Sequence, residues 1–453
     1  MSHELHGIVL RPGDAEYDAV RVIWNGMIDR RPAVIVRCRS SAEVRAAVLH
    51  AQAEGLAIAI RSGGHNVAGY AVCDGGLMID LSLMNGVRVD PALTCATVGG
   101  GATWADVDAA ATPFDRATPG GLISATGVAG LTLSGGVGWL RGTHGLSCDN
   151  LLAADVVLAS GTLVRASSDE NPELLWGLRG GGGNFGVVTS MDFALHPIAP
   201  EMMFTAPIYP EEIAAEILPR WRDFMAQAPD TVSGLAEFST IPQDPAYPQA
   251  IWGRRVMALP TVFDGPSGEG ARVTLPLRQL AEPLIDLSCV LSYRVIQTLY
   301  DGLFPKGRDR CYWKSTYLKG LGDDVIADIL AGLRRRPSEM TFSSIWYLGG
   351  AVSRVAGDAT AFGDRSMRWM LSLDAIWSDA VQDGANIGWV RELWQQMQRH
   401  STGRLYLNFP GLGEGDSLVR DAFGPGTYAR LQQIKRRYDP QNIFHLNQNI
   451  LPA

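Results

Sequence analysis

The chain has 453 residues, of which 46% are hydrophobic and 19% charged, and a formal net charge of −8 at pH 7. This length predicts two or more domains, and the acidic balance, with no basic run longer than residues 334–336, argues against a nucleic-acid partner. No apolar run reaches the roughly 18 residues of a membrane span, and the first residues lack a signal-peptide core. The six cysteines show no CxxC spacing, which argues against zinc or iron–sulfur sites. We therefore expect a soluble cytoplasmic protein with neither a metal nor a membrane partner.

The first expected elements form a β-α-β unit. Residues 32–39 predict a strand, Ser40 and Glu43 predict the capping box of a helix, and residues 56–60 predict the next strand. The glycine loop of residues 61–70, RSGGHNVAGY, follows this second strand. A dinucleotide fingerprint would place its glycines after the first strand and open a helix with them. A Rossmann NAD site therefore fits this loop poorly.

The loop of residues 61–70 combines small residues with one nucleophile. Its glycines let backbone N–H groups approach a ligand without interference from side chains. His65 is the only strongly nucleophilic side chain in the loop. We expect a cofactor to lie against this loop and to be bonded to His65, although a single buried histidine more often has no ligand.

Three further glycine clusters follow, at residues 99–101, 117–140 and 174–186. The glycines of 117–140 recur without helical or strand period, so this region would be disordered unless something packs on it. Its Thr and Ser residues make it a candidate bed for a large planar ligand with phosphates, with tight turns as the alternative. The strands predicted around these clusters are 76–81, 151–158 and 187–195.

The composition changes near residues 197–200, where the glycine clusters stop. Longer helices and aromatic strands follow, which predicts an α+β domain with a sheet backed by helices. The expected helices are 211–228, 323–335 and 386–400, and the expected strands are 342–348, 367–377 and 405–409. The chain then predicts a helix over 428–437 and a segment rich in amide side chains at 447–449.

Four motifs occur in an order that is typical of one protein family. They are RSGGHN (61–66), GVAGLTLSGGVGWL (127–140), LLWGLRGGGGNFGVVT (174–189) and YDPQNIFHLNQNI (438–450). The chain thereby resembles the FAD-linked oxidases of the berberine bridge enzyme-like group, within the vanillyl-alcohol oxidase, or PCMH-type, fold. The resemblance implies a two-lobed FAD-binding domain formed by residues 1–200 and 411–453. Between these parts it implies a substrate domain of residues 201–410, with an antiparallel sheet backed by helices.

The resemblance implies FAD as the cofactor, joined to His65 through the 8α-carbon of the flavin. Many relatives carry a second bond, through a cysteine four residues before the glycine that matches Gly127. That position is Ile123, and Cys148 does not match it, so we predict one covalent bond. Negative charge builds on the flavin during attachment, and Arg61 and the loop N–H groups are candidates to stabilise it. The other cofactor-binding residues that we infer are Ser62, Gly63, Gly64, Asn66, Gly69, Leu122, Thr126, Gly127, Gly130, Leu131, Ser134, Gly135, Gly136, Gly138, Val187, Asn447 and Asn449.

The resemblance also suggests a catalytic base. Relatives use a tyrosine on a Tyr-x-Asn strand to take a substrate proton while a hydride passes to flavin N5, and Tyr406-Leu407-Asn408 matches this pattern. A free phenol has a pKa of about 10, so ionisation near neutral pH requires cations or hydrogen-bond donors nearby. Tyr347 is the second candidate. The weaker candidates are Tyr70, Trp139 and Asp374, and for Asp374 we favour a structural role.

We therefore expect an FAD-dependent oxidoreductase that acts on an alcohol, a sugar or a secondary metabolite, with O2 or another acceptor taking the electrons. A catalytically inactive flavin-binding protein is the alternative from another class. A reductase similar to UDP-N-acetylmuramate dehydrogenase shares the fold, but its loosely held FAD does not suit a covalent role for His65.

Overall fold

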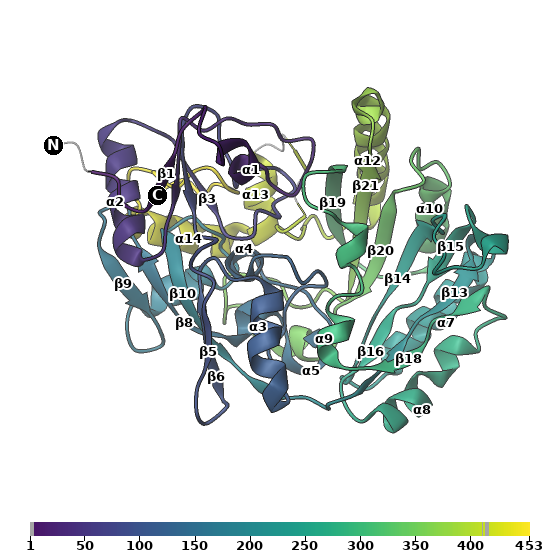
Figure 1. The fold of residues 1–453 in the computed structure, drawn as a ribbon. Helices are drawn as coiled ribbons and strands as arrows, with labels where there is room; N and C mark the ends of the chain where they lie inside the picture. The colour runs from purple at the N-terminus through teal and green to yellow at the C-terminus, as the bar shows by residue number, and fades with distance from the viewer. Residues whose placement is uncertain (1–3, 410, 413–415) are drawn as a thin grey trace.

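The computed structural model describes residues 4–409, 411–412 and 416–453. These residues form two lobes (Figure 1). One lobe contains the N-terminal elements together with the C-terminal helix α14 (Pro425–Tyr438), and the other is built on a large antiparallel sheet. The chain is therefore a mixed α+β protein, as its sequence predicts.

The first sheet contains the predicted β-α-β unit. Its order is β1-β2-β4-β3, and its strands are β1 (Ile8–Leu10), β2 (Val34–Arg37), β3 (Ile58–Arg61) and β4 (Leu77–Asp80). Helix α1 (Tyr17–Arg21) precedes β2, and α2 (Ser41–Ala53) joins β2 to β3. The Ser40 hydroxyl accepts the N–H of Glu43 at 3.3 Å, but the Glu43 carboxylate accepts the N–H of Arg39, not that of Ser40. One half of the predicted capping box is therefore present, and in the other half the carboxylate of Glu43 binds the N–H one residue before the N-cap.

The second sheet of this lobe is antiparallel, with the order β5-β6-β10-β8-β9. Its strands are β5 (Val87–Val89), β6 (Cys95–Gly99), β8 (Leu151–Val157), β9 (Leu163–Ala166) and β10 (Val187–Ala194). The remaining elements of this part are α3 (Trp104–Ala111), η1 (Thr112–Phe114), β7 (Arg116–Ala117), α4 (Val128–Leu133), α5 (Arg141–His144), η2 (Ser147–Asn150), α6 (Pro172–Leu178) and β11 (His196–Pro197). The glycine-rich region 117–140 contains helix α4, and Val128 and Leu133 anchor this helix in the hydrophobic core.

The second lobe is built on a ten-stranded antiparallel sheet. Its strands are β12 (Met202–Thr205), β13 (Pro207–Pro210), β14 (Val232–Thr240), β15 (Arg255–Ala258), β16 (Thr261–Phe263), β17 (Ile285–Asp286), β18 (Cys289–Leu291), β19 (Arg310–Leu318), β20 (Phe342–Tyr347) and β21 (Trp369–Trp377). The path β17-β13-β15-β14-β16-β12-β18 branches at β14, which pairs with β20, and β21 lies between β20 and β19.

The remaining helices lie between these strands in the sequence or follow them. They are η3 (Glu211–Ile213), α7 (Ala214–Gln227), η4 (Gln249–Ile251), α8 (Ser267–Arg278), α9 (Tyr293–Ile296), η5 (Asp301–Leu303), α10 (Asp323–Leu333), α11 (Ala351–Arg354), η6 (Ala380–Gln382), α12 (Asp383–Met397), η7 (Gln398–His400) and α13 (Asp416–Phe423). The three helices expected in this part are thus present, with the first and third each carrying a short 3-10 turn.

The two faces of the large sheet have different partners. Leu371 and Leu373 of β21 lie in the core that α7, α10 and α12 cover. Asp374, the next residue, points to the opposite face because successive strand residues alternate. On that opposite face Trp346 of β20 packs in a cluster with Tyr406. This second face, with its aromatic and acidic residues, looks toward the first lobe.

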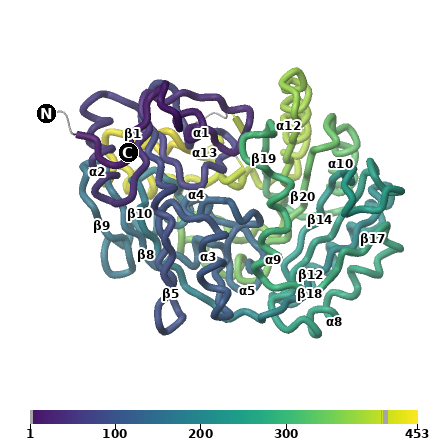
Figure 2. The backbone as a smooth tube through the Cα atoms, viewed as in Figure 1, coloured from purple at the N-terminus to yellow at the C-terminus, as the bar shows by residue number. Residues whose placement is uncertain are grey.

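The C-terminal segment returns to the N-terminal lobe (Figure 2). Phe444 is buried in the core that contains β2, α2 and β4. The buried Lys435 of α14 forms an ion pair with Asp439 at 2.6 Å, and its Nζ also donates to the carbonyls of Asn184 at 2.8 Å and Phe444 at 2.9 Å. The fourth glycine cluster and the last motif are therefore tied together. The domain limits at residues 200 and 410 stay a prediction, and residue 410 lies outside the described ranges.

One predicted strand is wrong. Residues 405–409 do not form a strand but an irregular segment that ends in a turn, in which Phe409 N–H donates to the carbonyl of Tyr406 at 3.0 Å. This segment runs beside β19, but its link there is a side chain: Ser315 Oγ accepts Tyr406 N–H at 3.0 Å and donates to Tyr406 O at 3.2 Å. The side chain of Ser315 thus bonds both the backbone N–H and the carbonyl of Tyr406, in place of the backbone hydrogen bonds of a strand pair.

Candidate functional site

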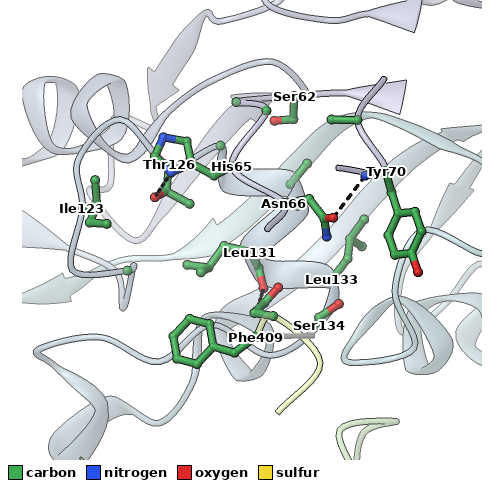
Figure 3. Close-up of a pocket in the computed structure, with 18 of the residues that line it drawn as sticks. Ser62, His65, Asn66, Tyr70, Ile123, Thr126, Leu131, Leu133, Ser134 and Phe409 are labelled. Carbon is green, nitrogen blue, oxygen red and sulfur yellow. Dashed lines mark hydrogen bonds between the residues drawn. The ribbon is translucent and has the colours of Figure 1, made fainter. Parts of the chain in front are cut away.

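A cavity of about 270 Å³ lies where the predicted motifs meet (Figure 3). The loop after β3 and the segment around α4 supply one part of its wall, and residues 183–188 and 446–448 supply another. The remaining wall comes from β14, β19, β20 and β21 and from the segment that carries Tyr406. The sites that the sequence predicts for a cofactor and for a substrate therefore open into one space.

Two glycines allow the loop after β3 and the segment before α4 to contact each other through their backbones. A Cβ atom on Gly63 would lie 2.3 Å from the backbone nitrogen of Gly127, and a Cβ atom on Gly127 would lie 2.2 Å from that of Gly63. Both distances are far inside van der Waals contact, so neither position has room for a side chain. The backbones of the first and second motifs can therefore lie in direct contact, because both residues at the contact are glycines.

His65 projects from the first loop into the cavity wall. Its Nδ1 lies 3.4 Å from Thr126 Oγ1, a contact drawn as a dashed line in Figure 3. Its ring stacks on Trp24 with centroids 5.5 Å apart and 18° between the planes. Burial, together with the charge of Lys306, lowers the pKa of His65 to about 4. The imidazole is therefore neutral at physiological pH, and one of its nitrogens carries a free lone pair that can act as a nucleophile.

The position predicted to lack a second nucleophile also faces the cavity. Ile123 is among the side chains that line it with His65. Cys148 does not line it: the side chain is buried in the core, where its Sγ lies 3.7 Å from Asp149, and burial raises the pKa of the thiol. Among the described residues, no cysteine lines this cavity.

Arg61 is directed away from the cavity. Its guanidinium donates to the carbonyl of Val20, and its Nε lies 3.8 Å from an oxygen of the buried Asp80. Arg61 is also absent from the residues that line the cavity. The cationic side chain that acts on His65 is Lys306, which local sequence patterns gave no reason to single out.

The phenolic oxygen of Tyr406 accepts three hydrogen bonds. The donors are the backbone N–H groups of Gly136 at 3.0 Å and Val137 at 3.1 Å and the side-chain amide of Asn408 at 2.8 Å. Asn408 Nδ2 also donates to the carbonyl of Leu131 at 2.9 Å, which fixes the amide. Burial raises the pKa of Tyr406 to about 12, and the three donors act in the opposite direction because they stabilise the phenolate.

Tyr347, the second candidate base, has different surroundings. It is absent from the cavity lining, and its ring packs on Trp369 with centroids 5.0 Å apart. The alternation along β20 explains this, because the preceding residue, Trp346, takes the cavity face.

The other predicted cofactor residues divide into two groups. Those that line the cavity with His65 are Ser62, Gly63, Gly64, Asn66, Leu122, Thr126, Gly127, Gly130, Leu131, Ser134 and Asn447. Those that do not are Arg61, Gly69, Gly135, Gly136, Gly138, Val187 and Asn449. Several glycines of the second group serve close packing: a Cβ atom on Gly138 would lie 2.1 Å from the carbonyl oxygen of Gly120.

The part of the cavity wall that comes from the second lobe is aromatic, and the sequence analysis did not single out most of its residues. The rings that line the cavity here are Tyr300, Phe304, Trp313, Phe342, Trp346 and Phe409. They touch one another, and the Phe409 ring stands edge-on to Tyr406 at 5.1 Å and to Trp313 at 5.3 Å. These residues come from separate strands and loops, so no local spacing could have grouped them.

Two buried carboxyl groups accompany this aromatic wall. Asp374 lines the cavity and accepts a hydrogen bond from the Ser372 hydroxyl, and burial raises its pKa to about 7. Glu237 accepts a hydrogen bond from Tyr300 at 2.7 Å, and burial, with a contribution from Asp374, raises its pKa to about 8. Asp374, for which the sequence favours a structural role, therefore reaches the cavity.

Among the described residues, no group of His, Cys, Asp and Glu side chains could hold a metal ion. In the same part of the chain no helix is long and apolar enough to cross a membrane.

Comparison with known proteins gives consistent matches over the whole chain. Residues 32–167 match the model of an FAD binding domain, and residues 405–451 match the family described as berberine and berberine like. The chain is 31% identical over 465 residues to (R)-6-hydroxynicotine oxidase from Paenarthrobacter nicotinovorans, which covers 99% of this chain and 97% of that protein.

Solved structures agree with these matches. The structure of 6-hydroxy-D-nicotine oxidase from Arthrobacter nicotinovorans has a TM-score of 0.86 at 29% identity, with 99% of each chain covered. Glucooligosaccharide oxidase from Acremonium strictum, which is described with a 6-S-cysteinyl, 8α-N1-histidyl FAD, has a TM-score of 0.87 at 22% identity, covering 98% of this chain and 97% of that one. At that identity the second likeness shows the fold alone.

Proposed function

The chain belongs to the berberine bridge enzyme-like family of FAD-linked oxidoreductases, and from this premise we propose that it oxidises an alcohol, a sugar or a secondary metabolite with an FAD held by one covalent bond to His65. FAD, when bound, supplies a hydride acceptor at N5. In the proposal O2 then takes the electrons, as in an oxidase. The observation that carries the proposal is the single cavity with neutral His65 on one wall and Tyr406, with its three donors, on another.

The residues of the cavity fit FAD. Gly63, Gly64 and Gly127 line the cavity without side chains, so a flat ligand can approach their backbone closely. The hydroxyl oxygen of Ser62 and the amide oxygen of Asn447 are buried and lack a partner among the described residues, and both residues line the cavity. Buried polar atoms of this kind are expected to bind a ligand or water. The proposed cofactor site therefore combines close approach with unpaired polar groups.

His65 suits the role of attachment residue. Attack on an electrophilic carbon requires an imidazole nitrogen with a free lone pair, and the lowered pKa of His65 keeps the ring neutral. The stacking on Trp24 and the contact with Thr126 limit the ring's rotation. We propose one link and no second one, because Ile123 is the residue that lines the cavity there.

Tyr406 suits the role of the group that takes the substrate's hydroxyl proton. Three N–H groups are aimed at this oxygen, and they stabilise a negative charge on it, which opposes the effect of burial on its pKa. The same donors would hold the charge on the oxygen while the proton is transferred. Asn408 thereby acts as a positioning residue through Tyr406, and Tyr347 has no part in the proposal because it does not line the cavity.

A panel of substrates tests the function. Under anaerobic conditions, at least one alcohol, sugar or secondary metabolite should bleach the flavin absorbance of the protein. In air the same compound should yield hydrogen peroxide, and bleaching without peroxide would instead indicate a dehydrogenase with another acceptor. If no compound reduces the flavin, the alternative of a catalytically inactive flavin-binding protein gains support.

A further inference from the structure

Two buried residues, Trp24 and Asn25, lie between the loop that carries His65 and the second lobe. The indole of Trp24 stacks on the imidazole of His65, with centroids 5.5 Å apart and planes 18° from parallel. Trp24 and Asn25 are 3% and 1% exposed, and neither is among the residues that line the cavity. Trp24 thus contacts the proposed attachment residue without reaching the space in which the flavin is proposed to lie.

Trp24 is bonded to both lobes. Its backbone N–H donates to the carbonyl of Gly64, the residue before His65, at 3.0 Å. Its carbonyl accepts the N–H of Gly307 at 2.8 Å, and its indole Nε1 donates to the carbonyl of Phe304 at 2.9 Å. Phe304 and Gly307 belong to the second lobe, between η5 and β19. Trp24 is therefore held by the loop after β3 on one side and by the second lobe on the other.

The side-chain amide of Asn25 forms another link between the same two parts. Its Nδ2 donates to the carbonyl of Val67, in the loop after β3, and to the carbonyl of Cys311, in β19, both at 2.8 Å. Its Oδ1 accepts the N–H of Cys311 at 3.1 Å and that of Met27 at 3.0 Å. Because both ends of the amide have partners, its orientation is fixed, and it ties β19 to the loop that carries His65.

The imidazole of His65 has few other restraints. Its only hydrogen-bond partner among the described residues is the Thr126 hydroxyl, and 3.4 Å is long for such a bond. Trp24 in turn stands edge-on to Trp313 with ring centroids 5.0 Å apart, and its centroid lies 6.1 Å from that of Phe304. Both of these rings line the cavity. The orientation of His65 therefore depends on Trp24, and that of Trp24 depends on the second lobe.

We propose that Trp24 and Asn25 couple the docking of the second lobe to the attachment of the flavin at His65. Trp24 is a positioning residue that holds the imidazole so that a nitrogen lone pair points at the 8α-carbon, and Asn25 keeps Trp24 in place. A misplacement of about 1 Å can slow such a reaction by about 10². The inference rests on the proposed bond to His65.

The attachment reaction is balanced by the acceptor of the proposed function. One C–H bond of the 8α-methyl group and the N–H bond of the imidazole are broken, and one C–N bond forms. The methyl carbon is oxidised, and O2 takes the two electrons and the two protons and becomes hydrogen peroxide. Trp24 and Asn25 donate no proton to this reaction and accept none, so their part is to orient His65.

The rate of attachment in cells that produce the full chain tests the inference. After an inhibitor of translation stops synthesis, samples are denatured with acid over time, and the intact mass gives the fraction of chains that carry FAD. Trp24→Leu removes the stacked ring and should slow attachment by about tenfold or more, whereas Trp24→Phe keeps a flat ring and should slow it by less than about threefold. Asn25→Ala keeps the indole but cuts the link to Cys311, and it should slow attachment by about threefold or more.

Two variants control for a loss of stability alone. Trp221→Leu removes a buried indole from the core of the second lobe, and Asn386→Ala removes a buried amide from α12. Neither residue lines the cavity, and both variants should attach FAD at the wild-type rate. A second measurement separates binding from attachment: purified Trp24→Leu and Asn25→Ala proteins should still hold FAD, which acid then releases.

Any of four outcomes would overturn the inference. Trp24→Leu or Asn25→Ala attaches FAD at the wild-type rate; Trp24→Phe is slowed as much as Trp24→Leu; a control variant is slowed as much as the test variants; or the slowed variants hold no flavin. Each of these leaves the proposed function standing, because the wild-type protein still carries attached FAD. Wild-type protein without attached FAD would instead contradict the proposed bond to His65 itself.

Discussion

At the phenolic oxygen of Tyr406, burial and hydrogen bonding act on the pKa in opposite directions. Removal from water disfavours the phenolate and raises the pKa to about 12, while donors from Gly136, Val137 and Asn408 favour it. The proton of this phenol is thus retained in the resting protein near pH 7. In the proposed role, Tyr406 can take the substrate's proton only after its own proton has passed to solvent, so the proposal requires ligand binding to lower the pKa of this phenol.

Replacement of Tyr406 by phenylalanine tests this residue. Tyr406→Phe removes the oxygen and leaves three N–H donors without their acceptor, so we expect flavin reduction to slow by about 10² or more. Substrate affinity should change far less. Anaerobic stopped-flow measurements separate the two quantities. Tyr347→Phe is the matched control, because that ring lies outside the cavity lining; a large effect there and none at Tyr406 would exchange their roles.

At the scale of the elements, the loop after β3 and the N-terminus of α4 cross in direct backbone contact. Gly127 precedes the first residue of α4, and its Cα lies against the backbone of Gly63. This crossing brings His65 and Thr126 to the same part of the cavity. The position of His65 therefore depends on two residues that have no side chain.

An alanine pair tests that crossing. Gly127→Ala would place a methyl group 2.2 Å from the nitrogen of Gly63, and we expect it to lower the free energy of unfolding by about 1–3 kcal/mol or more. Gly130→Ala, three residues on in α4, is the matched control. A Cβ atom there meets nothing within 4 Å, and alanine favours a helix over glycine by up to about 1 kcal/mol. Thermal unfolding of both variants should show a loss for the first only, and equal stability of the two would refute the close contact.

The large sheet carries an ionisable group at a cost to its own stability. The pKa of Asp374 is raised from 3.8 to about 7 in the folded protein, so the native state holds a proton that the unfolded chain releases between pH 4 and 7. The free energy of unfolding must therefore fall as pH rises through this window, and the penalty is complete above pH 7.

Asp374→Asn removes this penalty. The variant should be more stable than wild type at pH 8, by up to about 4 kcal/mol for a shift of about three pKa units, and the two should be similar near pH 4. Urea titrations at the two pH values measure the difference. A variant that is less stable than wild type at pH 8 would show that the carboxylate has a stabilising partner.

Across the whole molecule, the sequence predicted those helices and strands whose formation depends on residues close together in the chain. The β-α-β unit, the helices of the second lobe and the helix near residues 428–437 follow from periodicity and end signals, and the structure contains them. The strand expected at 405–409 is wrong because Ser315 replaces the backbone ladder there with side-chain bonds. An alternating or apolar pattern carries no information about such a partner 91 residues away.

In the candidate site, too, the residues of local motifs could be predicted from the sequence, whereas those brought together by strand pairing could not. The motif residues that line the cofactor side, such as His65 and Thr126, lie in recognisable glycine loops. The opposite wall of the cavity depends on strand register: Asp374 lies beside Trp313 and Phe342 only because β21 pairs with both β19 and β20. The face to which a strand residue points also depends on the whole sheet, so the sequence did not show that Trp346, and not Tyr347, lines the cavity.

The central claim is that one bond to His65 holds the flavin. The measurement that tests it most directly is the intact mass of acid-denatured protein after removal of all unbound flavin. Wild-type protein should carry the mass of one FAD, and the mass should survive reagents that block cysteines. His65→Ala should show the mass of the bare chain while remaining folded. Flavin released from the denatured wild-type protein, or flavin still attached to His65→Ala, would contradict the claim.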